Sequence, residues 1–368
     1  MQYREFGKTG LSASVLGFGM MRMQKKENGE YDEAWTTQTL RDAIDRGLNY
    51  VDTAYIYGES ERLTGNALRD GYREKVILAT KLPVINMTCE EDFDRLLNEQ
   101  LERLQTDYID VYLLHALNRK IWDEKVVPYN VIRSAEKALG EGKIRHLGFS
   151  FHDDLDAFRY ILDSYDKWEF CQIQLNYMDV NYQAGIKGLE EAHARGLAVV
   201  IMEPLRGGSL ANVTPEVAAM LPFDPIRSAL SFLWDRKEVS VVLSGMSTTE
   251  QVQQNLELAD HAVADALTDA ERKQIIAAGD SMRQVMSIPC TGCGYCDVCP
   301  QNIAIPEIFA IRNRMQIDGA RRAAEEAYRQ LGDRDASSCV SCGACMEKCP
   351  QHIDIPKKLA KVHTLMNE

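Results

Sequence analysis

Three strand-like apolar runs of the sequence each end at an ionisable residue. These residues are Asp52, Lys81 and His115, and Tyr57 follows the first of them by five positions. In a parallel α/β barrel the C-terminal ends of the strands share one face, and that face carries the chemistry. The sequence therefore predicts that an acid, a tyrosine, a lysine and a histidine converge at one site.

These four residue types suit a proton donor built from a tuned tyrosine. A free tyrosine titrates near pH 10, and a buried cation such as Lys81 favours phenolate and lowers that value. Asp52 would keep Lys81 charged, and His115 would orient a substrate carbonyl oxygen by a hydrogen bond. The predicted chemistry is general-acid catalysis at a carbonyl that receives hydride. Read singly, an Asp–Lys pair is often only a buried salt bridge and a strand-end His only a turn cap; the ordered set of four favours catalysis.

The elements that would position these groups alternate between strands and amphipathic helices. The expected strands are Val15–Gly19, Leu48–Thr53, Val76–Lys81, Tyr108–His115, Ile144–Ser150, Phe170–Leu175, Leu197–Met202 and Val239–Ser244. The expected helices include Glu33–Arg46, Glu90–Leu104, Asn130–Glu141, Asn181–Arg195 and Thr249–Ala259. Eight such units in about 250 residues predict an α/β fold, a (β/α)8 TIM barrel. An open doubly wound sheet also alternates, but no Gly-x-Gly-x-x-Gly follows the first strand.

The barrel is predicted to be one of two domains. Residues 2–14 before it suggest a short hairpin turning at Gly7–Gly10, and Asp269–Arg283 after it suggests a helix. From Ser287 the composition changes and becomes rich in cysteine. We therefore expect a barrel over residues 1–285 and a small, mostly helical domain over residues 286–368.

The barrel segment resembles the aldo-keto reductase family. The similar motifs are Asp52-Thr53-Ala54-x-x-Tyr57-Gly58-x-Ser60-Glu61, Ala79-Thr80-Lys81, Leu113-Leu114-His115, Gly148-Phe149-Ser150, Gln172, Pro204-Leu205 and Glu250-x-x-x-x-Asn255. The resemblance covers roughly residues 1–280. It implies that Tyr57 is the acid, that Asp52 and Lys81 tune it, and that His115 orients the carbonyl.

The same resemblance implies that NAD(P)H binds across the barrel mouth. Ser150 and Gln172 would hydrogen-bond the nicotinamide carboxamide, although they also suit a strand-end cap and a polar residue inside the barrel. Gly207 and Gly208 would let the backbone approach the pyrophosphate, or form a plain turn. The full set of expected cofactor-binding residues is Ser150, Gln172, Met202, Leu205, Gly207, Gly208, Gln251 and Asn255.

Several positions depart from the family pattern. Phe151 follows the serine where the family commonly has Asn, and Met202 replaces a tyrosine that stacks on the nicotinamide. Positions that usually carry Lys or Arg against a 2′-phosphate read Gly245, Ser247 and Gln251. A phosphate without a cationic partner is poorly held, so the sequence does not favour NADPH over NADH.

Eight of the ten cysteines form two runs near the C-terminus. These are Cys290, Cys293, Cys296 and Cys299, then Cys339, Cys342, Cys345 and Cys349. Each run ends in a repeated segment, Cys-Pro-Gln-x-Ile-x-Ile-Pro. The second run has the bacterial ferredoxin spacing for [4Fe–4S] clusters, while the first is one residue short before its last cysteine. Two four-cysteine zinc sites are the alternative, but they use CxxC pairs rather than triple runs.

The cysteine segment resembles two-cluster ferredoxins with a longer, helical insert. In such ferredoxins the fourth cysteine of each run crosses to the other cluster. The resemblance implies one cluster on Cys290, Cys293, Cys296 and Cys349. It implies a second cluster on Cys339, Cys342, Cys345 and Cys299.

The composition of the chain indicates its cellular location and the kinds of partner that it can bind. The net charge is −13, and the acidic excess lies within residues 1–289; nucleic-acid phosphates need a basic face, so nucleic-acid binding is not expected. No apolar run reaches the length of a membrane span, and the N-terminus has no signal-peptide core. We expect a cytoplasmic protein without membrane contact, whose partner is a small carbonyl or alcohol substrate. The predicted clusters leave room for a redox partner as well.

Two functions follow from these features. The first is an enzyme that reduces an aldehyde or ketone, or catalyses the reverse reaction, with nicotinamide hydride and two linked [4Fe–4S] clusters. The second is an iron–sulfur electron-transfer protein on a barrel that is not an active reductase. The complete set Asp52, Tyr57, Lys81 and His115 favours the enzyme.

Overall fold

The computed structural model describes all 368 residues and divides them into two compact units. The first comprises Met1–Pro204 and Leu230–Leu267, and the second comprises Leu205–Ala229 and Thr268–Glu368. The first unit holds the barrel strands, and the second holds all eight clustered cysteines. The predicted domain boundary between residues 285 and 286 stays a prediction.

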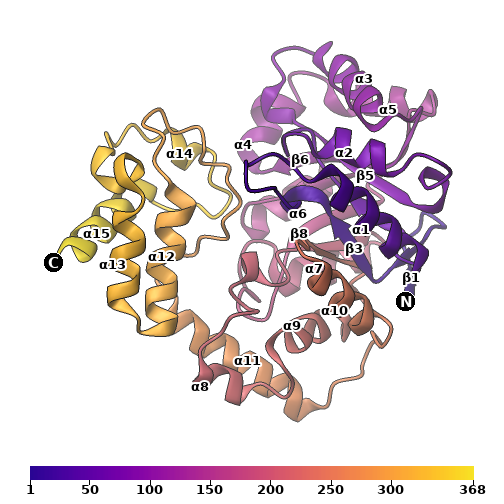
Figure 1. Ribbon diagram of the computed structural model, residues 1–368. Helices are drawn as coiled ribbons and strands as arrows, with labels where there is room; N and C mark the ends of the chain where they lie inside the picture. The colour runs from indigo at the N-terminus through magenta and orange to yellow at the C-terminus, as the bar shows by residue number, and fades with distance from the viewer. The chain divides into compact units, whose positions relative to one another are not determined.

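Eight parallel strands close into a barrel, which confirms the predicted fold class (Figure 1). The order around the barrel is β10-β3-β4-β5-β6-β7-β8-β9. The strands are β3 (Leu16–Gly19), β4 (Tyr50–Asp52), β5 (Ile77–Leu82), β6 (Ile109–Leu117), β7 (Ile144–Phe151), β8 (Phe170–Gln174), β9 (Ala198–Met202) and β10 (Val241–Ser244).

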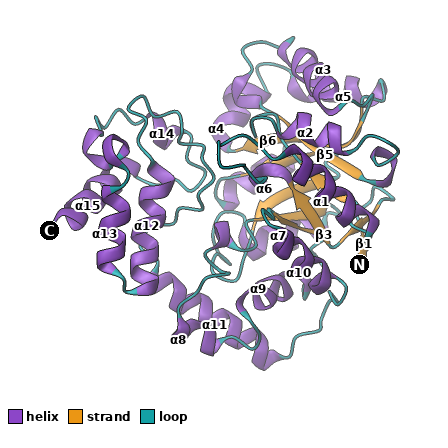
Figure 2. Cartoon of the chain, in the orientation of Figure 1, coloured by secondary structure: helices purple, strands orange, loops and turns teal.

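The barrel strands are apolar and closely packed, because they lie between the barrel interior and a layer of helices. Every residue of β5, β8 and β10 is buried, as expected for parallel strands covered on both faces. Gly148 in β7 allows close packing, because a Cβ there would lie 2.4 Å from the carbonyl oxygen of Phe170. Figure 2 shows helices around the strands. Inside the barrel, Tyr50, Val111 and Phe170 are fully buried in one apolar cluster, so side chains fill the interior.

The predicted N-terminal hairpin is also present and closes one end of the barrel core. Strands β1 (Tyr3–Glu5) and β2 (Ser12–Ser14) pair antiparallel. Phe6, in the connection between them, is fully buried, and its ring lies 5.7 Å from Tyr50 and 5.4 Å from Phe170. The Phe6 ring of the hairpin therefore packs against the N-terminal ends of the barrel strands.

The helices of the barrel unit follow the predicted pattern with shifted ends. They are α1 (Glu33–Asp45), α2 (Ser60–Ala67), α3 (Asp92–Leu104), α4 (Arg119–Ile121), α5 (Val131–Gly140), α6 (Leu155–Asp163), α7 (Gly185–Ala194) and α10 (Thr249–Ala259). Helix α7 begins four residues later than predicted, because Gln183 is left-handed (φ 56°) and a helix cannot run through it. A short turn, η1 (Met20–Arg22), follows β3, and α9 (Pro225–Trp234) crosses the division between the two units.

The second unit is helical. Its helices are α8 (Pro215–Met220), α11 (Asp269–Val285), α12 (Ile305–Asp318), α13 (Arg321–Arg329), α14 (Ala344–Glu347) and α15 (Ile355–Asn367). A capping box between Thr268 and Glu271 starts α11. Gly319 (φ 64°) ends α12 and splits the helical stretch expected between the two cysteine runs.

Helices α12, α13 and α15 lie side by side in Figure 1 and share one apolar core. Phe309 from α12, Tyr328 from α13 and Leu359 from α15 are buried in it together with Cys296 and Cys345. The cysteine segments are thus part of the packed interior. In neither unit is any helix both long and apolar enough to cross a membrane.

Candidate active site

Lys81 and Asp52 form a buried ion pair at the C-terminal ends of neighbouring strands. The Lys81 Nζ donates to Asp52 Oδ1 at 2.7 Å and to the Thr53 carbonyl at 2.7 Å. Lys81 is 0% exposed and Asp52 is 3% exposed. Burial lowers the pKa of Lys81 and raises that of Asp52, and each partner's charge opposes the shift of the other. Each residue is therefore needed to keep the other ionised.

Tyr57 lies beside this pair on the turn after β4. The turn is closed by hydrogen bonds from Tyr57 N to Ala54 O at 3.1 Å and from Ser60 N to Tyr57 O at 3.1 Å. The Lys81 ammonium lies 5.0 Å from the centroid of the Tyr57 ring. Tyr57 is partly exposed, so its phenol adjoins both a buried cation and the surface of the barrel.

His115 completes the predicted group of four. Its ring meets the Tyr57 ring edge-on, with the centroids 5.9 Å apart. Burial, then the charge of Lys81 and the proximity of His152, hold the pKa of His115 well below its usual value. The imidazole is therefore neutral and retains one N–H to donate. The structure brings together all four residues singled out from the strand ends.

Ser150 and Gln172 lie on adjacent strands next to this group. Ser150 Oγ accepts a hydrogen bond from Ala116 N at 2.7 Å, and Gln172 Nε2 contacts Met202 Sδ at 3.7 Å. The buried Oε1 of Gln172 has no hydrogen-bond partner. A buried acceptor without a donor is costly, and the amide N–H of a carboxamide would satisfy it. The residues present therefore fit a bound nicotinamide.

Two of the expected cofactor residues hold the loop after β10. Asn255 Nδ2 donates to Ser244 Oγ at 2.8 Å, and Gln251 Oε1 accepts from Ser247 N at 2.8 Å. Both side chains thus hold the segment that in the family usually carries the basic residues facing the 2′-phosphate of NADPH.

Sequence reasoning missed a basic residue at the same loop. Arg22, on η1, has its Cδ 3.5 Å from the position a Cβ would take on Gly245. Its carbonyl accepts from Ser247 Oγ at 2.7 Å, and its guanidinium lies 3.9 Å from Glu203. Only the pairing of β3 with β10 brings this arginine to the loop, so no local motif identified it.

The remaining cofactor candidates, Leu205, Gly207 and Gly208, lie in the second unit. Gly207 and Gly208 are both left-handed, with φ 64° and 92°. A Cβ on Gly207 would meet the carbonyl oxygen of Thr291 at 2.1 Å, whereas Gly208 faces open space within 4 Å. Gly207 is therefore required by its contact with the first cysteine run. Gly208 has space beside its Cα, but its N–H donates to Leu205 O at 2.9 Å and its carbonyl accepts from Ala211 N at 3.1 Å.

The cysteines form two neighbourhoods in the second unit. Burial raises the pKa of Cys345, and the nearby thiols of Cys299, Cys339 and Cys342 raise it further. Burial and the nearby thiols of Cys293 and Cys290 raise the pKa of Cys296. Cys299, from the end of the first run, thus lies near the cysteines of the second.

The repeated segments also repeat in structure. Asn302 N donates to Cys299 O at 3.0 Å, and His352 N donates to Cys349 O at 3.1 Å. Asn302 and His352 have φ of 52° and 50°, and a proline in the first turn starts the helix that follows each. No three His, Cys, Asp or Glu side chains converge closely enough to hold a single metal ion. A cubane needs a wider set, because each thiolate binds a different iron.

Two family models match this chain. The model described as "Aldo/keto reductase family" matches residues 15–275, and the model described as "4Fe-4S dicluster domain" matches residues 289–353. The two matches follow one another along the sequence, in the order predicted from the motifs.

Curated relatives are similar over the barrel. The chain is 34% identical over 174 residues to "Aldo-keto reductase YhdN" of Bacillus subtilis, covering 44% of this chain and about half, 51%, of that protein. It is 31% identical over 227 residues to "6-dehydroglucose reductase" of Novosphingobium aromaticivorans, covering 57% of this chain and 71% of that protein. Among solved structures, the aldo-keto reductase AKR11C1 from Bacillus halodurans in its holo form superimposes with a TM-score of 0.63 at 25% identity, over 76% of this chain and 96% of its own.

Proposed function

The chain belongs to the aldo/keto reductase family, and we propose that it interconverts an aldehyde or ketone and the corresponding alcohol with a nicotinamide cofactor. Its barrel and its family make it an oxidoreductase. One observation carries the finer proposal. The buried Lys81–Asp52 pair, at 2.7 Å, lies directly beside the phenol ring of Tyr57.

In this proposal Tyr57 gives its proton to the carbonyl oxygen of the substrate. The nicotinamide, when bound, supplies the hydride. The ammonium of Lys81 favours the phenolate that remains on Tyr57 after the transfer. Asp52 keeps Lys81 charged in a site where burial alone would neutralise it. In the alcohol-oxidising direction the same phenolate takes up the proton, so one site serves both directions.

His115 orients the carbonyl before the proton moves. Its pKa is too low for a second positive charge at neutral pH, so the neutral ring donates its single N–H to the carbonyl oxygen. The ring contact with Tyr57 supports this, because both groups then address the same oxygen. Two donors at one oxygen stabilise the charge that develops there.

Gln172 and Ser150 are proposed to hold the nicotinamide. The unsatisfied Oε1 of Gln172 would accept from the carboxamide N–H, and the Ser150 hydroxyl would donate to the carboxamide oxygen. Met202, in contact with Gln172, would pack against the ring in place of the aromatic residue usual in the family.

We further propose that the second unit binds two [4Fe–4S] clusters with crossed ligation. Cys339, Cys342, Cys345 and Cys299 would hold one cluster, which the shared neighbourhood of Cys345 supports. Cys290, Cys293 and Cys296, which share a second neighbourhood, would hold the other together with Cys349, which the ferredoxin pattern assigns to it. Each cluster carries one electron at a time, so a redox partner would exchange electrons with it singly.

Anaerobic purification followed by turnover assays tests this function. NADH or NADPH is mixed with a panel of aldehydes and ketones, and cofactor oxidation and cluster absorbance are followed together. The proposal expects carbonyl-dependent cofactor oxidation at an unchanged cluster spectrum. Cluster reduction by the cofactor with no carbonyl consumed would instead favour the electron-transfer protein.

A further inference from the structure

Glu61 is a fully buried carboxylate immediately behind the candidate catalytic group. It is the second residue of α2 and is 0% exposed. Its neighbour Ser60 pins this end of the helix, with its Oγ 2.6 Å from Thr53 Oγ1 and donating to Met20 O at 2.9 Å. Since Tyr57 lies four residues upstream, α2 carries Glu61 and fixes the Tyr57 turn at the same time.

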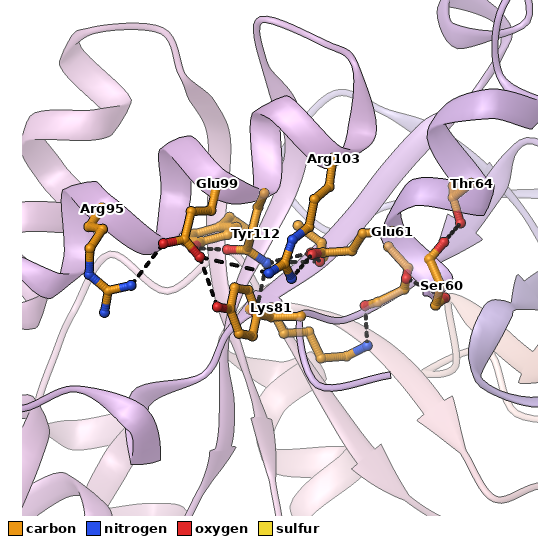
Figure 3. A network of polar contacts seen from close by, with 12 residues as sticks. Ser60, Glu61, Thr64, Lys81, Arg95, Glu99, Arg103 and Tyr112 are labelled. Carbon is orange, nitrogen blue, oxygen red and sulfur yellow. Dashed lines mark hydrogen bonds and ion pairs between the residues drawn. The ribbon is translucent and has the colours of Figure 1, made fainter. Parts of the chain in front are cut away.

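Three donors from other elements converge on the Glu61 carboxylate. Thr80 Oγ1 donates to its Oε1 at 2.7 Å, and Gln100 Nε2 donates to the same oxygen at 2.7 Å. The third donor, Arg103, lies on α3 and reaches Oε2 at 3.3 Å (Figure 3). The carboxylate therefore joins strand β5 to α3 at the residue just before Lys81.

Gln100 extends this contact to Lys81 itself. Its Nε2 lies 3.0 Å from the Lys81 carbonyl, and its Oε1 accepts from the buried phenol of Tyr112 at 2.6 Å. The amide is thus held in one orientation, because one end faces acceptors and the other faces a donor. Glu61 and Gln100 together hold the backbone of Thr80 and Lys81 in position.

Glu61 also acts on Lys81 by charge. Burial raises the pKa of Glu61, whereas the hydrogen bonds from Thr80 and Gln100 and the charge of Arg103 lower it. The negative charge of Glu61 in turn raises the pKa of Lys81, in the same sense as Asp52. Lys81 is therefore held between two carboxylates, only one of which it touches.

We propose that Glu61 is a positioning residue that keeps Lys81 charged and in place, and that it acts on Tyr57 through Lys81. The inference rests on the proposed function. It assigns Glu61 no contact with substrate or cofactor. The groups that interact with its charge are Arg103 on α3, Lys81 on β5 and Tyr112 on β6. Asp52 on β4 and Tyr57 adjoin Lys81, and Tyr55 lies against Arg103. The elements packed against α2 also carry Glu33 on α1, Glu99 on α3 and Arg22 on η1.

The direct test is the titration of Lys81 in the full-length protein loaded with its clusters. Isotope labelling of the lysine Cε carbon gives one resonance per lysine. The resonance that is missing from the Lys81→Met variant is that of Lys81. Glu61→Gln keeps the shape of the side chain and removes its charge. The Lys81 midpoint should then fall by about one pH unit, the scale of a single charge in a buried site. Glu61→Asp keeps the charge and should restore most of that midpoint.

Glu102→Gln is the matched control. It makes the same chemical change on α3, at a carboxylate that is exposed to solvent. We expect the Lys81 midpoint to stay at its wild-type value in this variant. A Glu61→Gln protein that is folded and titrates like wild type would overturn the inference. This readout needs no turnover, so it separates failure here from failure of the proposed function.

The pH profile of carbonyl reduction gives a second test. Loss of the Glu61 charge lowers the pH at which Lys81 loses its proton, so the basic limb of kcat/KM should move to lower pH. If Glu61→Gln does not fold, Arg103→Gln replaces it, since Arg103 is partly exposed. Protonation of Glu61 weakens the hydrogen bonds from Thr80 and Gln100 that hold the Lys81 backbone, so activity should fall below the pKa of Glu61. Without Arg103 that pKa rises, so the acidic limb should move to higher pH. An acidic limb at its wild-type position in Arg103→Gln would count against Glu61.

Discussion

At the scale of single residues, the proposed chemistry depends on Lys81. Its side chain is fully buried, and its ammonium has two direct acceptors, Asp52 and the Thr53 carbonyl. A buried cation is tolerated only when it is paired. Loss of either partner should therefore destabilise the fold, and the intact pair holds a positive charge beside the Tyr57 ring.

Asp52→Asn should destabilise the barrel as well as inactivate it. It removes one partner of a buried pair and leaves Lys81 uncompensated, which costs about 3–5 kcal/mol. Urea unfolding of the variant and of wild type measures this loss. The double variant Asp52→Asn, Lys81→Met removes both charges and should recover part of it. Equal stability of the single variant and wild type would contradict the pairing.

Cofactor choice is also set by single residues. We expect NADH to bind at least as tightly as NADPH, because Gly245, Ser247 and Gln251 offer no cation to a 2′-phosphate. Fluorescence titration with each cofactor measures this. A clear preference for NADPH would contradict the expectation and point to Arg22, the basic side chain beside Gly245. Arg22→Ala would then abolish the preference.

At the scale of elements, the sequence predicts the site residues that follow the ends of strands. It does not predict the residues that reach the site only when helices and strands pack together. Asp52, Lys81 and His115 follow apolar runs, and the barrel rule places such positions on one face. Glu61 and Arg22 lie on a helix and a turn that reach the site only when α2 packs on α3 and β3 pairs with β10. No periodicity in the chain records those contacts. Likewise, a two-glycine turn was predicted, but the need for Gly207 comes from the distant Thr291.

The loop Arg206–Gly208 and the first cysteine run form one packed element of the second unit. Gly207→Ala should therefore disturb cluster binding, because its Cβ would meet the Thr291 carbonyl oxygen at 2.1 Å, next to Cys290. Gly208→Ala is the control, since it bears a similar left-handed strain but faces open space. Iron and labile-sulfide analysis should show a loss in Gly207→Ala and little change in Gly208→Ala. Equal cluster contents would show that the contact is unimportant.

At the scale of the whole molecule, the chain joins an aldo/keto reductase barrel to a segment that matches a 4Fe-4S dicluster domain. A nicotinamide moves two electrons as hydride, whereas an iron–sulfur cluster moves one. The acidic excess lies in residues 1–289, while the cysteine-rich segment after it has equal numbers of acidic and basic residues. The sequence predicted this division from composition and cysteine spacing. The pairing of each cysteine with its cluster came only from the resemblance to ferredoxins.

Cys349→Ser tests the crossed ligation. We expect loss of the cluster held by Cys290, Cys293 and Cys296, with the barrel still folded because its eight strands close without the tail. Iron analysis and cluster spectroscopy identify which cluster is lost. Cys89→Ser, at an exposed cysteine outside both runs, is the control and should keep both clusters. Loss confined to the cluster of Cys339, Cys342 and Cys345 would overturn the crossed assignment.

The most direct test of the central claim is carbonyl reduction by Tyr57→Phe. The substitution keeps the ring against His115 and Lys81 and removes only the proton donor. Tyr72→Phe, which removes a phenol that donates to Asp45 away from the site, is the matched control. We predict that Tyr57→Phe lowers kcat/KM by about 10²-fold or more, the usual scale for a general acid, while Tyr72→Phe and cluster content stay at wild-type values. Full activity of Tyr57→Phe would contradict the account.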